Sequence, residues 1–516
     1  MPRCTSTGRK CDGYITLPEG SQRPGARSLS PCSLQLTAPL EANGERPAVE
    51  LFSYQTAKHL AGFFQNDTFW KRFVLQLSHN EPAISKALSA VNLAYRQAEQ
   101  SGRQPFHLDD RSIIRSYNDA IRHLAHKAIT PDKGVYIPLV ACILFVCLEF
   151  IRGDMKAALS HIRGGWKVLE SLQQNTRDTG LLEGLRPSSP SSGYSTSSES
   201  ELMAELSSTF NRLQVQAVLF DSSVLPIAEP TTNFKDDFSS SMTTISSLAE
   251  VKSRHFQLGA ETIGLALSAS KIKYDTTGIT LDQIICQIRL DTQFQQWRQA
   301  YNQLSSRQRP KWNEHEFRAA NIILMQNISM HIWANTCLSP EETSFDKFRS
   351  GFEEIIDLAS RTVGYGCQDL CRLVGNFQFD MGIIPPLHFT GAKCRWPLLR
   401  RKVLKILGSM QWREGLFDSY RSYRYVHMLM KTEEVVWSPV LNLDSPSFDE
   451  STIPIPPEPV RVHIAELGPL PLGASQQTIT LMVKPNGVYN CPVTWQVTIP
   501  TSGDLPPLES WFTWSP

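Results

Sequence analysis

The chain has 516 residues, long enough for a large buried core and for two or three domains. Its 51 Lys and Arg residues almost balance its 50 Asp and Glu residues, which argues against a protein whose whole surface coats nucleic acid. Eleven cysteines are an ordinary content, and several lie in apolar runs, so we expect reduced thiols in an intracellular protein.

The amino-terminal end combines a pair of cysteines with a local excess of positive charge. Cys4 and Cys11 are separated by six residues, and Arg9 and Lys10 directly precede the second cysteine. Two thiolates do not complete a tetrahedral zinc site, so residues 1–14 alone are either an incomplete metal-binding segment or a coincidental pair. Residues 15–49 are rich in Pro, Ser and Gly without a sustained period, which predicts a disordered linker.

From residue 50 to about residue 445, apolar residues recur at helical spacing, which predicts an irregular, all-α, multi-helix body. In one such helix Pro82 suits the first turn, and the apolar positions are Ile84, Leu88, Val91 and Tyr95. Further helices are predicted around Asp110–Ala128, Pro138–Ile151, Met155–Gln173 and Leu202–Leu219, over "LDQIICQIRLDTQFQQWRQAYNQL" and over "PLLRRKVLKILGSM". The serine-rich stretch at about 186–201 predicts a disordered loop inside this body.

The most apolar run of the chain is "VYIPLVACILFVCL", from Val135 to Leu148. It contains Pro138 and is followed by Glu149. A membrane-spanning helix needs about 20 apolar residues, so this run is too short and is predicted to be a buried core helix.

Residues 446–516 change in character, from helical spacing to prolines followed by strand-like alternation. Ile453–Pro459 is Pro-rich and "VRVHIAEL" alternates between polar and apolar residues. The stretch "TITLMVKPNGVYNCPVTWQVTIP" indicates a hairpin around Pro485-Asn486-Gly487. We therefore expect a small β appendage that closes the mainly α body.

Motifs of enzymatic chemistry are absent from the sequence, which has no glycine-rich phosphate loop, no G-x-S-x-G and no H-E-x-x-H. His315, between Glu314 and Glu316, lacks a third metal ligand and is interpreted as part of a solvated helix face. Cys367 and Cys371 have no partners at zinc spacing and are interpreted as part-buried helix residues. We predict that the chain is not an enzyme, and we assign no catalytic or cofactor-binding residue.

The basic segment "KCRWPLLRRKVLK", Lys393–Lys405, allows two interpretations. It could be a nuclear-import signal or a patch that contacts phosphates. An apolar stripe at helical spacing nevertheless runs through it, consisting of Leu399, Val403, Ile406 and Met410. The stripe favours an amphipathic helix with Arg401 and Lys405 on a solvated basic face.

Several stretches of the body resemble, in the same order, the regulatory domain of fungal Zn(2)-Cys(6) binuclear-cluster transcription factors. They are "AGFFQNDTFWKRFVLQLSHNEPAISKALSAV", "SYNDAIRHLA", "LVACILFVCLEFIRGDMKAALSHIRGGWKVL", "FNRLQVQAVLF" and "GIIPPLHFTGAKCRWPLLRRKVLKIL". "PVRVHIAEL" and "PLESWFTW" resemble that family's carboxyl-terminal end, so the resemblance covers nearly the whole chain.

In that family, six cysteines in the pattern C-x2-C-x6-C…C-x2-C-x6-C share two zinc ions. "PRCTSTGRKCDGY" is similar to the end of this cluster, which makes Cys4 and Cys11 the fifth and sixth ligands, and Met1 stands where the fourth is expected. The other register, in the first half of the motif, needs a further cysteine soon after Cys11, and the next one is Cys32.

The resemblance implies a nuclear transcription regulator of RNA polymerase II target genes, with DNA in the full-length form and transcription co-regulators as partners. A homodimer is one assembly it allows, no membrane partner is expected, and a specialised-metabolite gene cluster is a family-level expectation for the targets. In the family, DNA contacts come mainly from the first half of the cluster, so Arg9 and Lys10 alone would bind DNA weakly. Zinc is expected only if the missing upstream segment is present, and not in the chain as given.

Two explanations of the incomplete cluster stay open: a start codon assigned too late, which we favour because "DGY" stays in register, or a naturally shortened regulator. The alternative function is a DNA-binding-deficient helical co-regulator or interaction protein that acts through partners. An enzyme built on an all-α body is a third reading, which the missing catalytic motifs disfavour.

Overall fold

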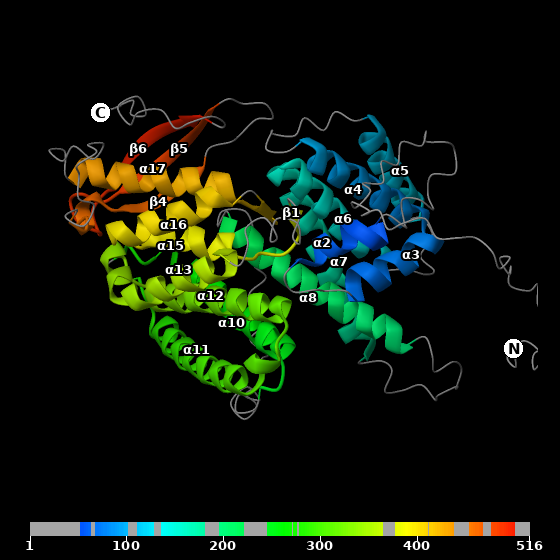
Figure 1. Ribbon diagram of the computed structural model, residues 1–516, viewed down its shortest axis with the longest axis horizontal. Helices are drawn as coiled ribbons and strands as arrows, with labels where there is room; N and C mark the ends of the chain where they lie inside the picture. Colours follow the sequence, from blue (N-terminus) through cyan, green and yellow to red (C-terminus); the bar gives the residue numbers. More distant parts are fainter. Residues whose placement is uncertain are drawn as a thin grey trace, which may run out of the picture. The chain divides into compact units, whose positions relative to one another are not determined.

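The structure, a computed structural model, describes residues 52–62, 68–101, 111–127, 136–180, 196–220, 245–270, 272–275, 278–364, 377–410, 412–437, 454–467 and 476–500. All of them belong to one compact unit, Glu45–Pro516. This part of the chain is mainly helical, as the sequence predicts, with two small sheets (Figure 1). The predicted cluster remnant at 1–14, the linker at 15–49 and most of the loop at 186–201 lie outside the described residues.

The amino-terminal helices, blue to cyan in Figure 1, include four that the sequence predicts. They are η2 (Phe52–Thr56), α2 (Ala57–Ala61), η4 (Thr68–Phe73), α3 (Val74–Asn80), α4 (Pro82–Ser101), α5 (Arg111–Lys127), α6 (Tyr136–Arg152) and α7 (Met155–Gly180). Helix α4 packs against α5 and α6, and α6 packs against α7. The helices predicted from the apolar spacing are thus confirmed, and α7 continues beyond its predicted end.

Helix α6 is buried over almost its whole length, which confirms the core helix predicted from its apolar run. Ile143, Leu144 and Val146 are fully buried. Pro138 lies in the first turn, where a missing N–H leaves no helical hydrogen bond unmade. Among the described residues, no helix is long and apolar enough to cross a membrane.

Helix α8 (Thr196–Phe220) begins six residues before the predicted start at Leu202. Residues 196–201, the end of the stretch predicted to be a disordered loop, are therefore helical, and that part of the prediction is wrong. At the end of this stretch, the Glu201 carboxylate pairs with the Arg72 guanidinium at 2.9 Å. The serine-rich composition does not predict this contact with a residue more than 120 positions away.

The second group of helices runs from green to orange in Figure 1. It consists of α10 (Leu248–Ser270), α11 (Leu281–Gln308), η6 (Arg309–Lys311), α12 (Glu314–Thr336), η7 (Glu342–Phe348), α13 (Arg349–Gly364), α15 (Ile384–Lys393), α16 (Pro397–Ser409) and α17 (Ser419–Trp437). Helix α10 packs against α11 and α12, α12 packs against α13, and α15, α16 and α17 pack together. Capping boxes fix two starts, Thr280 with Gln283 for α11 and Asn313 with Glu316 for α12.

A three-stranded sheet that the sequence does not predict lies between the helices. Its strands are β1 (Phe377–Gln378), β2 (Arg413–Glu414) and β3 (Phe417–Asp418), with β1 parallel and β3 antiparallel to β2. The buried Glu414 carboxylate accepts the N–H groups of Gly382 and Ile384, each at 2.8 Å. Ile384 is the first residue of α15 and Gly382 lies two residues before it, so Glu414 supplies the acceptor that a helix start needs.

The same region is bonded to α8. The Arg212 guanidinium donates to the Asp380 carboxylate at 3.0 Å, and both side chains are buried. The Gln216 amide nitrogen donates to the Phe379 carbonyl at 3.2 Å. Helix α8 is thereby tied to a segment more than 160 residues away along the chain.

The carboxyl-terminal sheet confirms the predicted strands and hairpin. Strands β4 (Val462–Leu467), β5 (Gln476–Val483) and β6 (Val493–Pro500) form an antiparallel sheet in sequence order. Gly487, with φ of 105°, lies in the β5–β6 connection. One face of the sheet packs on α17 in a small core of Met428, Leu429, Val462, Ile479, Leu481, Val483, Val497 and Ile499. The sheet is therefore packed into the helical body.

Candidate functional site

The residues predicted to bind zinc or DNA, Cys4, Cys11, Arg9 and Lys10, all lie outside the described part of the chain. So does the "CQDLC" segment at 367–371. Among the described residues, no group of three or more His, Cys, Asp or Glu side chains is placed to hold a metal ion. The zinc and DNA sites therefore stay predictions.

His315 and its two acidic neighbours form the first turn of α12. The Glu316 carboxylate accepts the Asn313 N–H at 2.9 Å, and Glu314 pairs with Arg318. The half-buried His315 ring places Nε2 3.3 Å from the Gly62 carbonyl oxygen. The turn predicted to be solvated thus makes capping and tertiary contacts.

Five charged side chains from neighbouring elements meet in the interior, and we call them the ion-pair cluster. They are Glu342 of η7, Lys393 at the end of α15, Arg395 in the α15–α16 connection, Arg400 of α16 and Glu433 of α17. The side chains of Arg395, Arg400 and Glu433 are at most 1% exposed. Charges this deeply buried are tolerated only when each has a partner.

Glu433 and Glu342 together bond all three cations of the cluster, and Arg395 bonds both carboxylates. One Glu433 oxygen accepts Arg395 Nη2 at 3.0 Å, and the other accepts Arg400 Nη1 at 2.6 Å. Glu342 accepts Arg395 Nη1 at 3.0 Å and Lys393 Nζ at 2.8 Å. Arg395 therefore bridges the two carboxylates, and its guanidinium joins η7 and α17 to the α15–α16 connection.

The ion-pair cluster also holds the first strand of the carboxyl-terminal sheet. Val462, which begins β4, donates its N–H to Glu433 at 2.9 Å, and its carbonyl accepts Arg395 Nη2 at 3.0 Å. The preceding residue, Arg461, makes two bonds to the Asp346 carboxylate, at 2.7 and 2.9 Å. The start of β4 is thus fixed by charge-assisted hydrogen bonds to η7, α17 and the α15–α16 connection.

Opposite charges keep both carboxylates of the cluster ionised. Burial alone raises the pKa of Glu342, but Lys393 and Arg395 outweigh burial and lower that pKa to about 2. Burial likewise opposes ionisation of Glu433, and Arg395 and Arg400 nevertheless lower its pKa. Both carboxylates are therefore ionised at neutral pH, although they are shielded from water.

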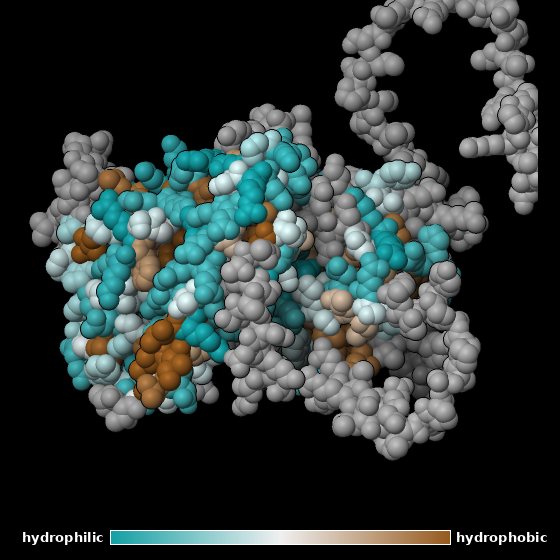
Figure 2. Space-filling model, turned by 90° about the horizontal axis from the view of Figure 1, so that it is seen from below, coloured by the Kyte–Doolittle hydropathy of each residue, from teal (hydrophilic) through white to brown (hydrophobic). Residues whose placement is uncertain are grey.

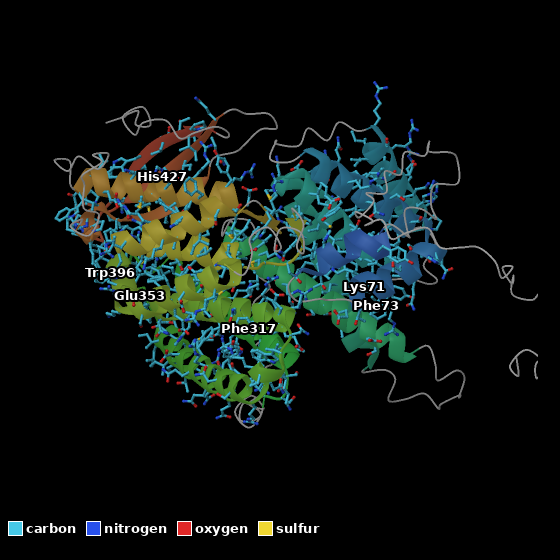
Figure 3. The ribbon with its side chains drawn as sticks, viewed as in Figure 1. Lys71, Phe73, Phe317, Glu353, Trp396 and His427 are labelled. Atoms are coloured by element: carbon cyan, nitrogen blue, oxygen red, sulfur yellow. The ribbon has the colours of Figure 1, made fainter. Side chains whose placement is uncertain are left out.

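The basic segment Lys393–Lys405 does not present Arg401 to solvent, so this prediction is wrong for Arg401. Its guanidinium donates two bonds to Glu434 of α17, at 2.7 and 3.0 Å, and its side chain is 16% exposed. Lys405 is exposed, as predicted. Trp396, labelled in Figure 3, carries the Arg349 guanidinium 4.2 Å from its ring centroid. Most of the charge of this segment is thus used inside the protein.

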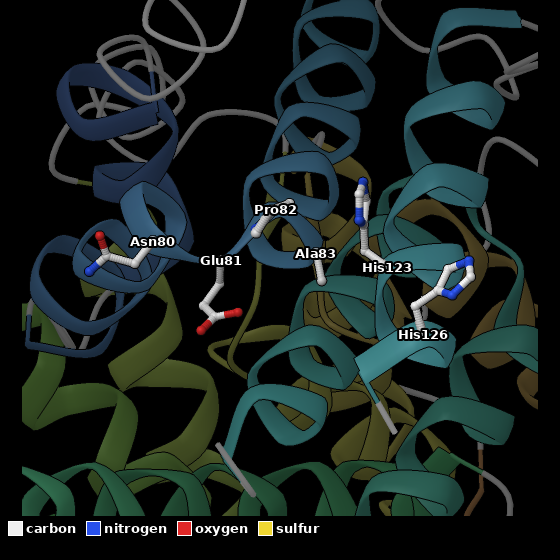
Figure 4. A pocket seen from close by; sticks show the side chains of 6 residues that line it. All are labelled: Asn80, Glu81, Pro82, Ala83, His123 and His126. Atoms are coloured by element: carbon white, nitrogen blue, oxygen red, sulfur yellow. The ribbon is translucent and has the colours of Figure 1, made fainter. Parts of the chain in front are cut away.

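An open depression of about 370 Å³ lies where α3 meets α4, next to α5 (Figure 4). Its lining consists of Asn80, Glu81, Pro82, Ala83, His123 and His126. The two imidazoles come from one face of α5 and are exposed to solvent. The lining contains no serine, threonine or cysteine that a histidine could activate, so the depression offers no basis for nucleophilic catalysis.

The family model described as "Fungal specific transcription factor domain" matches residues 49–432. The chain belongs to this family. Among curated proteins, the Aspercryptin biosynthesis cluster-specific transcription regulator atnN of Emericella nidulans is 29% identical over 197 residues, 33% of this chain and 31% of that protein. The chain thus matches about a third of that relative's length. No solved structure matches the chain.

The fungal-specific transcription factor domain, as matched, ends one residue before Glu433. Glu433 lies just beyond this end, and it bonds Arg395, Arg400 and the Val462 N–H. One carboxylate therefore joins the family domain to the carboxyl-terminal sheet.

Replacing Glu433 with Ala should lower the free energy of unfolding by about 3–5 kcal/mol, because two buried arginines lose their shared partner. Glu353, labelled in Figure 3, is the matched control, since its pair with Arg349 at 2.9 Å is roughly half exposed. Glu353→Ala should cost less than about 1 kcal/mol. Urea denaturation followed by circular dichroism measures both, and equal losses would contradict a structural role for the cluster.

Acid should remove the contribution of Glu342 between about pH 4.5 and pH 2. The folded pKa of about 2 lies below the ordinary value of 4.5, so the stabilisation is complete above pH 4.5 and is lost as the pH falls. Glu342→Gln should therefore be less stable at pH 7 and should show a shallower loss of stability below pH 4.5. Urea denaturation at a series of pH values checks this, and an unchanged acid slope would rule out Glu342 as the titrating group.

Proposed function

We propose that the protein is a fungal transcription regulator that acts in the nucleus on RNA polymerase II target genes. The match of residues 49–432 to the fungal-specific transcription factor domain carries this proposal. The relative that aligns with a third of the chain is a regulator of a biosynthesis cluster. This likeness supports a narrower proposal for the target genes, namely the gene cluster of a specialised metabolite.

The described body fits a regulator that works through contacts with other macromolecules. Its buried cations are neutralised by buried carboxylates of the same chain, so Arg395 and Arg400 are not available to a nucleic acid. Its open depression offers no catalytic pair. We assign to this body the binding of transcription co-regulators, and we place the contact with DNA elsewhere.

DNA contact belongs, in this proposal, to the segment that holds Cys4, Cys11, Arg9 and Lys10. Structural zinc sites take four ligands in tetrahedral geometry, and two thiolates do not meet that requirement. Cys4 and Cys11 thus do not fit zinc by themselves, and the proposed site needs further ligands, which the resemblance to the end of a zinc cluster places before Cys4. With a complete ligand set, metal binding would fold this segment, and Arg9 and Lys10 would add phosphate contacts.

Deleting the gene should lower the transcripts of one contiguous set of biosynthetic genes together, because a cluster-specific regulator acts on neighbouring promoters as a group. RNA measurement in the deletion strain and in a strain with the gene restored checks this. Scattered changes that spare every such gene set would contradict the cluster-specific part. Unchanged transcripts throughout would contradict transcription regulation itself.

The 516-residue chain should bind no stoichiometric zinc and no specific DNA site, whereas a form extended upstream should carry two zinc ions and bind DNA specifically. Metal analysis and DNA-binding assays with and without a chelator measure both forms. In the extended form, Cys11→Ser should abolish specific binding, and Cys32→Ser, a cysteine outside the proposed ligand set, should leave it unchanged.

Two results would change the assignment. Two zinc ions and specific binding in the 516-residue chain would show that its own ligands suffice. An extended form that binds neither zinc nor DNA would end the zinc-cluster proposal. The alternative, a helical co-regulator that acts through protein partners, would then replace it.

A further inference from the structure

Helix α11 carries a row of aliphatic side chains that face solvent, which we call the α11 stripe. It consists of Leu281, Ile284, Ile285 and Ile288, which are 69%, 41%, 54% and 62% exposed. Their spacing of three, four and seven residues places them on one side of the helix. Figure 2 looks from the side on which α11 lies in Figure 1 and shows a hydrophobic patch among hydrophilic atoms.

The α11 stripe is not the face by which the helix packs on the protein. That packing face lies further along the helix and consists of Leu290, Phe294, Trp297, Ala300, Tyr301 and Leu304. At about 100° per residue, the packing face and the α11 stripe point in opposite directions. One helix therefore has two apolar faces, and the protein uses only the second.

In the first two turns of α11 the usual polarity is inverted. The side toward the body is polar, because Gln283 donates to the Ser268 hydroxyl at 3.0 Å and Gln287 donates to the Ala334 carbonyl at 2.8 Å. The side toward water is aliphatic. A helix that lies between a core and water has the reverse arrangement, so this surface resembles one that a partner covers.

Two exposed charges of opposite sign flank the α11 stripe. Asp282 stands at its amino-terminal end and Arg289, 60% exposed, at its carboxyl-terminal end. They are seven residues apart, almost two full turns, and so lie on the same flank of the helix. Arg289 also contacts Glu261 of α10, at 3.4 Å, which leaves most of its guanidinium in solvent.

We propose that the α11 stripe is a self-association surface, on which a second copy of the chain lays its own α11 in antiparallel orientation. A two-fold axis between Ile285 and Cys286 lays the two stripes antiparallel, two residues (about 3 Å) away from exact overlap, so that their side chains interdigitate. The same axis brings one flank of α11 opposite the same flank of the partner. Asp282 then faces the partner's Arg289, and Arg289 faces the partner's Asp282. The surface is thus complementary to itself, as an isologous interface requires.

The size of the α11 stripe sets the strength of this association. Two helical turns span about 11 Å, and four aliphatic side chains cover less than the roughly 800 Å² per partner of a standard stable interface. The dimer is therefore weak, and a high local concentration of the chain would favour it.

Sedimentation equilibrium of the 516-residue chain, from about 1 to 200 μM, should show a concentration-dependent monomer–dimer equilibrium. Ile284→Lys should weaken association at least tenfold. The matched control is Ile121→Lys on α5, because Ile121 is also 41% exposed, and it should leave association unchanged. Both side chains are solvent-exposed, so thermal melts of the two variants should match that of the wild type. A chain that stays monomeric, or equal effects of the two variants, would overturn the proposal.

A charge exchange tests the antiparallel register. Asp282→Lys and Arg289→Glu should each weaken self-association by about threefold to tenfold, because each places like charges opposite one another twice. An equimolar mixture of the two variants should associate again, since both pairs of facing side chains in the mixed dimer then carry opposite charges. A mixture that stays as weak as the single variants would overturn this register. Failure of either experiment leaves the proposed zinc and DNA functions untouched, because those are measured on the extended form.

Discussion

The buried carboxylate of Glu433 is the group on which the carboxyl-terminal part of the structure depends. It bonds Arg395, Arg400 and the first N–H of β4, so two helical segments and a sheet converge on one side chain. Replacing a buried ion pair by apolar residues of equal volume is often neutral, so the pairs need not add net stability. Their effect is geometric: Arg395 reaches both of its carboxylate partners only where Glu433 and Glu342 lie on either side of it. We infer that the cluster selects one way of docking the sheet on the helices. The sheet should therefore unfold together with the helical body.

The fold follows from the sequence where local pattern decides it. The apolar run of α6 and the alternation around Pro485-Asn486-Gly487 each specify an element through neighbours close in the chain, and both predictions are confirmed. The sheet of β1, β2 and β3 was not predictable in this way, because its strands are two residues long and Glu414 binds backbone N–H groups about 30 residues away. The start of α8 at Thr196 was not predictable either, because the serine-rich composition of that stretch does not indicate a helix.

Among the candidate sites, too, local sequence pattern is visible in advance and contacts between distant residues are not. The cysteine pair Cys4 and Cys11 is visible in the sequence, and it lies outside the described residues, so the predicted zinc segment rests on pattern and resemblance. The ion-pair cluster is not predictable from the periodicity of the basic segment, because its acidic partners lie far away in the chain. Glu342 is on η7, more than 50 residues earlier, and Glu433 and Glu434 are on α17, more than 30 residues later. One signal was available: Glu433 and Glu434 interrupt the apolar spacing of "YVHMLMKTEEVVW", where carboxylates need cations if that face is buried.

Two features depart from the usual arrangement of apolar residues inside and charged residues outside, namely the ion-pair cluster and the α11 stripe. In the ion-pair cluster, charge lies inside, and each cluster residue has a partner from the same chain, so the departure is resolved by folding. On α11, aliphatic side chains lie outside while glutamines fill the inner side, and folding leaves the aliphatic surface in water. Exposed apolar area of this kind has a solvation cost that only association removes. The aliphatic surface of α11 is thus the part of the described protein that the proposed self-association would remove from water.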